Sequence, residues 1–268
     1  MNLNLKYQLL LTGLLVIVTV LIMPKYLPDP YMQNLAIALQ PPDITHLCGT
    51  DRYGRDVLAR VIAGMQVTLG SSLVLLLVVT IAGSSLGLLS GLAGGILDSV
   101  IMRFTDVFLA FPEMVLAIAV AGVLGGGVYP AMLAVGITGW TRYARLARAL
   151  VLNLKNEPYI AEAQMNGAGT FNIIRNHIMP NIAGPVIVTA ALHSSSIIME
   201  LAGLSFLGLG VMPPAAEWGA MLNDGRSMLQ QAPWLTLAPA AAIFLVAAIM
   251  NNLADTMRDY FDKRSRQM

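Results

Sequence analysis

The stretch Tyr159–Asn181, YIAEAQMNGAGTFNIIRNHIMPN, interrupts the apolar C-terminal half of the chain with polar residues and decides how that half folds. Its first eight residues include good helix formers, so we expect a short helix there. Gly167 and Gly169 then break the helix, because glycine reaches positive φ without a side-chain clash. Thr170 is a suitable N-cap for a second helix, and Pro180 either closes that helix or begins the next. A helix-turn-helix between two membrane spans has no core of its own, so we expect a partner protein or the lipid interface to cover its apolar side.

The composition is that of a membrane protein. Of the 268 residues, 56% are hydrophobic and 12% are charged, whereas about 25% of the residues of a soluble domain are charged. The net charge of +1 and the lack of a basic block exclude a nucleic-acid surface. A single cysteine, Cys48, excludes an internal disulfide and a multi-cysteine metal site.

No motif in the sequence indicates an enzyme. There is no GxxxxGK[ST] phosphate loop, so we expect no ATP hydrolysis by that mechanism. Residues 83–87 match the G-x-S-x-G nucleophile pattern, but they lie in an apolar run and not at the strand-to-helix turn which that chemistry needs.

Apolar runs predict six transmembrane helices. They begin with residues 9–23, 70–96 and 106–127, continue with a helix starting at 128, and end with 182–204 and 233–253. We divide the chain into residues 1–69, a first span followed by an extracytoplasmic segment and an amphipathic helix, and residues 70–268, a five-helix core that contains the 159–181 loop. Six spans would place both termini on one side, together with eleven of the sixteen lysines and arginines, so we expect that side to be cytoplasmic.

Four local patterns add detail to this layout. Gly83, Gly87 and Gly91 lie four residues apart and predict a close helix–helix seam. Residues 98–106 read as a short polar connection. Pro112 should bend the third span, and Glu113 should lie in the bundle interior or near the membrane interface, because exposure of a charge to lipid is costly. Three arginines spaced i, i+3 and i+6 should share one face of the fourth span; they are Arg142, Arg145 and Arg148.

Two broken segments flank the core. Residues 46–70, HLCGTDRYGRDVLARVIAGMQVTLG, read as two turns before an amphipathic helix, either a solvated helix cap or part of a functional surface. Residues 205–231, SFLGLGVMPPAAEWGAMLNDGRSMLQQ, contain too many glycines and prolines to span, so we expect a re-entrant or surface segment. The residues that we single out in these segments are Gly49, Thr50, Asp51, Gly54, Arg55, Asp56, Glu217, Trp218 and Gly219.

All three stretches resemble the permease subunits of ABC importers of the dipeptide/oligopeptide/nickel family. Residues 159–181 are similar to the EAA loop, which docks into the ATPase subunit; Ala161-Glu162-Ala163 stands in the place of Glu-Ala-Ala, and His177–Pro180 in the place of a His/Ile-x-Leu-Pro ending. Glu162 comes one position later than usual, a rotation of roughly 100° on a helix. Residues 49–69 are similar to the GTD-x-x-GRD signature and residues 204–221 to the LSFLGLG…EWG-x-M signature.

The resemblance implies an all-α membrane protein with the six-helix fold of type I ABC importer permeases and a cytoplasmic coupling loop. It also implies a bacterial inner-membrane location, a second and different permease subunit, two ATPase subunits and an extracytoplasmic solute-binding protein. This chain would bind no cofactor, since ATP and Mg²⁺ belong to the ATPase subunits. The implied coupling residues are Ala161, Glu162, Ala163, Gly167, Gly169, His177 and Pro180.

The span at 182–204 offers candidates for the translocation pathway. His193 and Glu200 are seven residues apart and therefore share a face, with Met199 beside them. Two ligands rarely make a specific metal site, so bonding to a partner helix is favoured over metal ligation. For the cargo, the short chain and the residues at 166–169 and 201–203 favour nickel or a metal chelate. A dipeptide or oligopeptide is the alternative, and a secondary transporter with paired broken helices is a more distant one.

Overall fold

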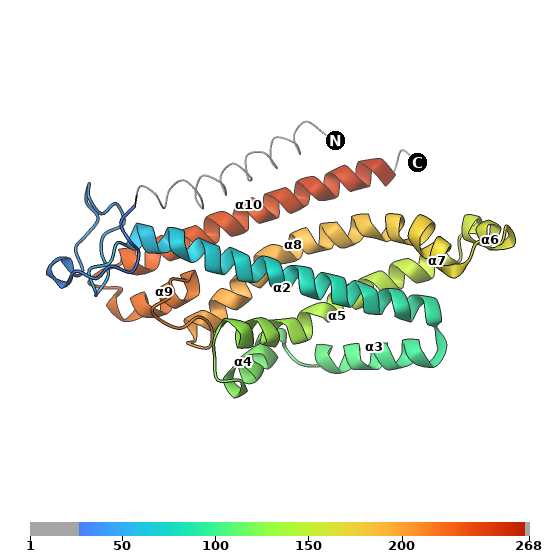
Figure 1. Ribbon diagram of the computed structural model, residues 1–268, viewed down its shortest axis with the longest axis horizontal. Coiled ribbons are helices and arrows are strands. Elements are labelled where there is room, and N and C mark those ends of the chain that lie inside the picture. Colours follow the sequence, from blue (N-terminus) through green and yellow to red (C-terminus); the bar gives the residue numbers. More distant parts are fainter. Residues whose placement is uncertain (1–26, 266–268) are drawn as a thin grey trace.

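The computed structural model describes residues 27–265, and the side chains of residues 27–261. In this part of the chain the long helices lie along one axis, with α9 and the loops before α2 at one end of the molecule and α6 at the other (Figure 1). We call these the α9 end and the α6 end. The elements are η3 (Leu35–Ile37), α2 (Val57–Ala93), α3 (Gly95–Leu109), α4 (Glu113–Val123), α5 (Val128–Lys155), α6 (Pro158–Met165), α7 (Thr170–Ile173), the π-helical η4 (Ile174–Ile178), α8 (Met179–Phe206), α9 (Trp218–Gly225), η5 (Arg226–Met228) and α10 (Trp234–Ser265).

The all-helical membrane architecture is confirmed. Among the described residues, three helical segments are long and apolar enough to cross a membrane: 57–93, 170–206 and 234–261. The α3–α4 pair adds a fourth if it is taken as one span bent by 87°. Helix α5 has 28 residues, but the arginines in its second half reduce its apolar character. The span expected at 9–23 lies outside the described residues.

Two expectations about helix boundaries are wrong. The amphipathic helix and the second span form one helix, α2, so the division at residue 69 falls inside it; α2 ends only at Gly94, where φ is +64°. Residues 95–109 form helix α3 instead of a polar connection. Of the two roles expected for Pro180, the structure has the second: it begins the next helix and lies in the first turn of α8, a position that tolerates proline.

Helix α3 is stable because its acidic side chains face the arginines of α5. Arg148 donates two hydrogen bonds to Asp98, one of 2.6 Å from its Nη2 atom, and Arg145 pairs with Asp106. At the start of α4, the Glu113 carboxylate lies 4.0 Å from Arg142. The three arginines therefore share one face, as predicted, and each has an acidic partner on α3 or α4.

The glycine seam is also confirmed. A Cβ atom added at Gly83 would lie 2.2 Å from the carbonyl oxygen of Trp140, and one added at Gly87 would lie 2.3 Å from that of Ala144. Real Cβ atoms do not approach backbone atoms so closely, so helices α2 and α5 are in contact through their backbones.

Three apolar clusters fill the bundle. The main cluster lies between α2, α4, α5 and α8. A second lies at the α9 end around the fully buried Trp218. The third lies at the α6 end and consists of Val151, Ile160, Ile173, Ile178 and Ile182.

The seam makes a stability prediction. Substitution Gly87→Ala should push α2 away from the Ala144 carbonyl and lower the free energy of unfolding by about 1–3 kcal/mol, the usual cost of overpacking. Gly70→Ala is the matched control, because no atom lies within 4 Å of its added Cβ and alanine favours a helix. Thermal unfolding of both variants in detergent tests this; equal midpoints would show that the seam does not restrict residue size.

Candidate functional site

The α6 end carries a helical elbow, residues 158–178, that projects beyond the bundle (Figure 1). Gly167 has φ +82°, and its N–H donates to the carbonyl of Gln164 at 3.0 Å. The left-handed backbone here requires glycine, as the sequence predicts. Gly169 does not need to be glycine, since its φ is −69°, and it occupies the N-cap position that was expected of Thr170.

The elbow has a small core of its own, contrary to the expectation that only a partner or lipid would cover it. Ile160, Ile173 and Ile178 are buried against Val151 and Ile182, the last turns of α5 and the first of α8. The three isoleucines come from the apolar faces of the elbow helices, but the residues that they pack against belong to α5 and α8. The core fixes the elbow to the bundle.

The outer face of the elbow remains exposed. The Met165 side chain is 82% exposed and that of Phe171 is 73% exposed. Ala161, Glu162, Gly167, Gly169 and Pro180 are exposed, whereas Ala163 and His177 are half-buried. The His177 ring lies 6.0 Å from that of Tyr159 and so links the two arms of the elbow. Large apolar side chains beside a carboxylate suit a protein–protein contact.

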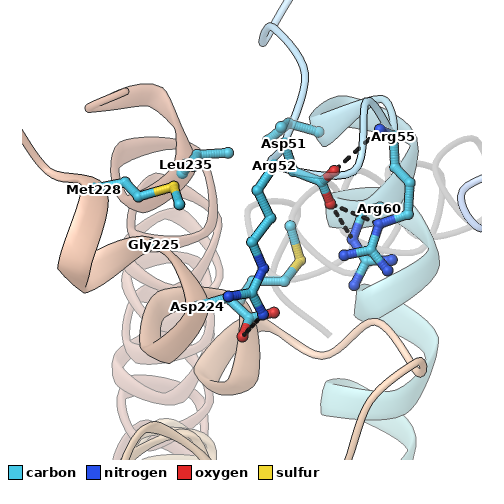
Figure 2. Close-up of a pocket in the computed structure, with 10 residues that line it drawn as sticks. Asp51, Arg52, Arg55, Arg60, Asp224, Gly225, Met228 and Leu235 are labelled. Carbon is cyan, nitrogen blue, oxygen red and sulfur yellow. Dashed lines mark hydrogen bonds and ion pairs between the residues drawn. The ribbon is translucent and has the colours of Figure 1, made fainter. Parts of the chain in front are cut away.

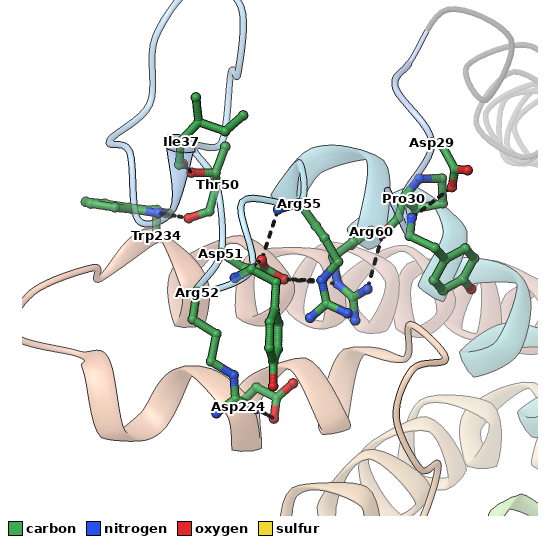
Figure 3. A network of polar contacts seen from close by, with 12 residues as sticks. Asp29, Pro30, Ile37, Thr50, Asp51, Arg52, Arg55, Arg60, Asp224 and Trp234 are labelled. Carbon is green, nitrogen blue, oxygen red and sulfur yellow. Dashed lines mark hydrogen bonds and ion pairs between the residues drawn. The ribbon is translucent and has the colours of Figure 1, made fainter. Parts of the chain in front are cut away.

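The opposite end is held by a buried ion-pair network (Figure 3). The Asp51 carboxylate accepts hydrogen bonds from the backbone N–H groups of Tyr53 and Arg55 and from Nε of Arg55 at 2.6 Å. Arg60 lies 3.7 Å from the same carboxylate. Asp51, Arg55 and Arg60 are all buried, so this network is an interior feature and not a solvated loop.

The neighbouring turn residues close the loop and begin α2. Asp56 caps α2 through a 2.7 Å bond from the Ala59 N–H and also contacts His46 at 2.8 Å. Thr50 forms an isolated β-bridge with Asp56, and its carbonyl accepts a bond from the indole of Trp234.

Two glycines of this loop have left-handed backbones. Gly49 and Gly54 have φ near +70°, and a Cβ at Gly54 would lie 1.8 Å from the Asn34 oxygen. Burial raises the pKa of the nearby Cys48 thiol, which packs with the second apolar cluster.

The EWG segment is attached to α2. Glu217 caps α9, accepting bonds from the N–H groups of Gly219 and Ala220 at 3.0 and 2.8 Å, and the Thr68 hydroxyl donates to it at 3.2 Å. The Trp218 indole donates to the Val61 carbonyl at 2.8 Å. The two motifs that the sequence presents 150 residues apart therefore form one structural unit, and α9 lies at the bundle end as a non-spanning element.

A pocket lies between these two motifs (Figure 2). Arg52, Arg55 and Arg60 approach it from the α2 side, and Asp224, which pairs with Arg52 at 3.3 Å, from α9. It continues into a wider space of about 290 Å³ along Pro213–Pro214. The arginines exceed the acidic residues at this pocket, so its field is positive.

A polar cluster lies in the middle of the bundle. One ligand atom each from Glu113, His193 and Glu200 lies within 4.8 Å of the other two. His193 is 1% exposed, and its Nδ1 atom is 3.1 Å from the Tyr143 hydroxyl. The structure thus unites His193 with Glu200, as their spacing predicts, and adds Glu113. Met199, the third residue predicted for the pathway, is 61% exposed.

Comparisons with known proteins agree with this architecture. Residues 83–267 match the family described as "Binding-protein-dependent transport system inner membrane component". The probable D,D-dipeptide transport system permease protein of Escherichia coli K12 is 38% identical over 96% of this chain and 88% of the relative. The nickel transport system permease protein of the same strain is 36% identical over 87% and 84%. The dipeptide permease of Haemophilus influenzae is 36% identical over 95% and 89%.

The fold has a solved counterpart. A chain of the inward-facing MetNI methionine ABC transporter aligns with a TM-score of 0.59 and 15% identity, covering 74% of this chain and 95% of that one. Fold and site together define a multi-pass membrane permease of an ABC importer. The chain belongs to the family of binding-protein-dependent transport system inner membrane components, and its relatives are of the dipeptide and nickel permease type predicted from its motifs.

The buried cap makes a second prediction. Glu217→Gln replaces a carboxylate that holds three donors, so the free energy of unfolding should fall by about 1–2 kcal/mol, the usual value of an N-cap. Asp224→Asn is the control, since it breaks only a partly exposed ion pair with Arg52 and should cost a few tenths of a kcal/mol. The test is to compare the unfolding midpoints of the two variants with that of the wild type. An equal loss of stability in both variants would contradict the role of Glu217 as the cap of α9.

Proposed function

We propose that this permease forms half of the translocation pathway of an ATP-driven importer of short peptides. It pairs with a second, different permease subunit, rests on two ATPase subunits that bind ATP and Mg²⁺, and receives its cargo from an extracytoplasmic solute-binding protein. The observation that carries the proposal is the exposed outer face of the elbow, held on a buried isoleucine core. The peptide cargo is supported by relatives named as dipeptide permeases, which align over 95–97% of the chain.

The charge distribution supports the orientation of the proposed subunit. In the described chain, α3, the second half of α5, η4 and the last third of α10 contain nine lysines and arginines, whereas the segments at the α9 end contain four, Arg52, Arg55, Arg60 and Arg226. Helix α10 ends on the same side of the bundle as α6 (Figure 1). Because basic residues concentrate on the cytoplasmic side, the elbow faces the cytoplasm and the pocket at the α9 end faces outward. The ATPase subunits and the binding protein then approach from opposite ends.

The helical segment that begins in the second arm of the elbow supplies the mechanical link. Residues 170–206 form one near-continuous helical segment of 37 residues, roughly 55 Å long at 1.5 Å per residue. Its far end touches α9, since a Cβ added at Gly219 would lie 2.2 Å from the Ala202 oxygen. Closure of the ATPase dimer moves the elbow, and this segment carries the movement past His193 and Glu200 to the α9 end.

A nickel ion or metal chelate is the second candidate cargo. The specific observation in its favour is the cluster of Glu113, His193 and Glu200, a set of nitrogen and oxygen ligands that suits first-row transition metals. The nickel permease relative also aligns over 87% of the chain.

Uptake measurements test the cargo. In a strain that lacks this gene, uptake of a radiolabelled dipeptide should be lost and uptake of radiolabelled nickel should persist. The gene on a plasmid should restore the dipeptide uptake. Loss of nickel uptake alone would replace the peptide cargo by the metal. Failure of the tagged chain to copurify with ATPase subunits would overturn the importer assembly itself.

The elbow makes a prediction about coupling. Gly167→Val places a β-branched residue at φ +82° in otherwise open space, so it should distort the elbow without a steric clash in the bundle. We expect uptake to fall about tenfold or more while ATP hydrolysis continues. Gly169→Ala, at φ −69°, should have a much smaller effect. Normal uptake by Gly167→Val at equal expression would show that the elbow angle does not govern coupling.

A further inference from the structure

We infer that Glu113, His193 and Glu200 form a binding site for one divalent transition-metal ion inside the permease bundle. The site goes beyond the proposed cargo, because its ligands and their geometry do not depend on what the importer carries.

Two helices bring the three side chains together. His193 and Glu200 lie two turns apart on one face of α8, and Glu113 is the first residue of α4. The 87° bend between α3 and α4 directs the start of α4 to this face. One ligand atom of each residue lies within 4.8 Å of the others. Ions of this class hold such ligands at about 2.0–2.2 Å, so the carboxylates move inward when the ion binds.

The cluster has buried atoms without partners. His193 is 1% exposed, and its Nε2 atom has no hydrogen-bond partner. The Oε2 atom of Glu200 is also buried and unpartnered. Leaving a ring nitrogen and a carboxylate oxygen unsatisfied in the interior is costly. A cation between them would satisfy both atoms at once.

The surroundings prepare the imidazole for a metal. The Tyr143 hydroxyl lies 3.1 Å from Nδ1 of His193. When Nδ1–H donates to that hydroxyl, Nε2 carries the free lone pair that would bind the ion. A ligating histidine usually has its second nitrogen held in this way. Tyr143 is therefore a positioning residue for the site.

The donor set selects the ion. One imidazole nitrogen with two carboxylates favours Ni²⁺, Co²⁺ or Zn²⁺ over Mg²⁺ and Ca²⁺, which prefer oxygen alone. Three protein ligands leave a fourth position for water or a bound cargo. Two neighbours contact Glu113: the Thr138 hydroxyl donates to it at 3.4 Å, and Arg142 lies 4.0 Å away. The Arg142 side chain is half exposed, so it is free to move aside as the ion enters.

Cobalt binding tests the site directly. The full chain in its importer complex is purified by a histidine-free tag, treated with EDTA and titrated with Co²⁺, which reports its coordination by visible absorption. We expect the wild type to bind one Co²⁺ per chain at the cluster. In Glu200→Gln and in Glu113→Gln, the affinity for this ion should fall at least about tenfold. Tyr143→Phe should weaken binding and shift the absorption band, an effect that a purely structural role would not produce.

The control is His177→Gln, which removes a histidine outside the cluster and should leave the cobalt spectrum unchanged. His193→Gln should also lose the cobalt site. If that variant does not fold, Glu113→Gln and Glu200→Gln still test the site, because both glutamates are only half-buried. Equal Co²⁺ binding by the wild type and Glu200→Gln would overturn the site, as would a spectrum without a nitrogen ligand.

A second arm distinguishes the two origins of the ion. Addition of Mg²⁺ and ATP to the cobalt-loaded complex releases the ion if it is cargo and leaves it bound if it is a resident part of the bundle. Both results support the site. Because binding is measured without transport, failure of the proposed peptide import would leave this result intact.

Discussion

The close approach of α2 and α5 is the constraint on which the rest of the structure depends. At Gly83 and Gly87 the two backbones are so near that even a methyl group would collide with a carbonyl oxygen. In a bilayer, helices gain little from burying apolar surface against each other, so close backbone packing supplies the attraction. This contact fixes the direction of the α5 arginines, which in turn hold α3 through Asp98 and Asp106.

The two ends of the bundle depend on this frame in different ways. At the α9 end, polar groups are removed from water and satisfied almost completely: Asp51 holds Arg55, and Glu217 holds two backbone N–H groups and Thr68. At the α6 end, the isoleucine core fixes only one side of the elbow and leaves Phe171 on the other side exposed. This difference between the two ends is consistent with the role proposed above, in which α8 carries movement from the elbow to the α9 end.

Local patterns predicted much of this arrangement, and long-range partners account for what they missed. The glycine spacing, the turn at Gly167 and the helical class follow from residues near one another in the sequence. Residues 98–106 were predicted to be a polar connection because the partners of Asp98 and Asp106 lie 50 and 39 positions away. The contact of Thr68 with Glu217 joins positions 149 apart, and Glu113 reaches His193 only because of the bend before α4. The periodic pattern of apolar residues along the sequence does not reveal such long-range contacts.

The unsatisfied atoms of the described bundle are informative because they are of two kinds. Thr80, Ser84 and Thr236 have hydroxyl oxygens without partners, but a hydroxyl on a helix can rotate to the carbonyl of the preceding turn at little cost. The His193 ring and the Glu200 carboxylate have no such option, since neither reaches its own backbone easily. A membrane bundle that keeps both groups within 4.8 Å of Glu113 bears a cost that apolar residues would remove. Such a cost is retained where the groups act on a ligand, and a cation is the ligand that all three share.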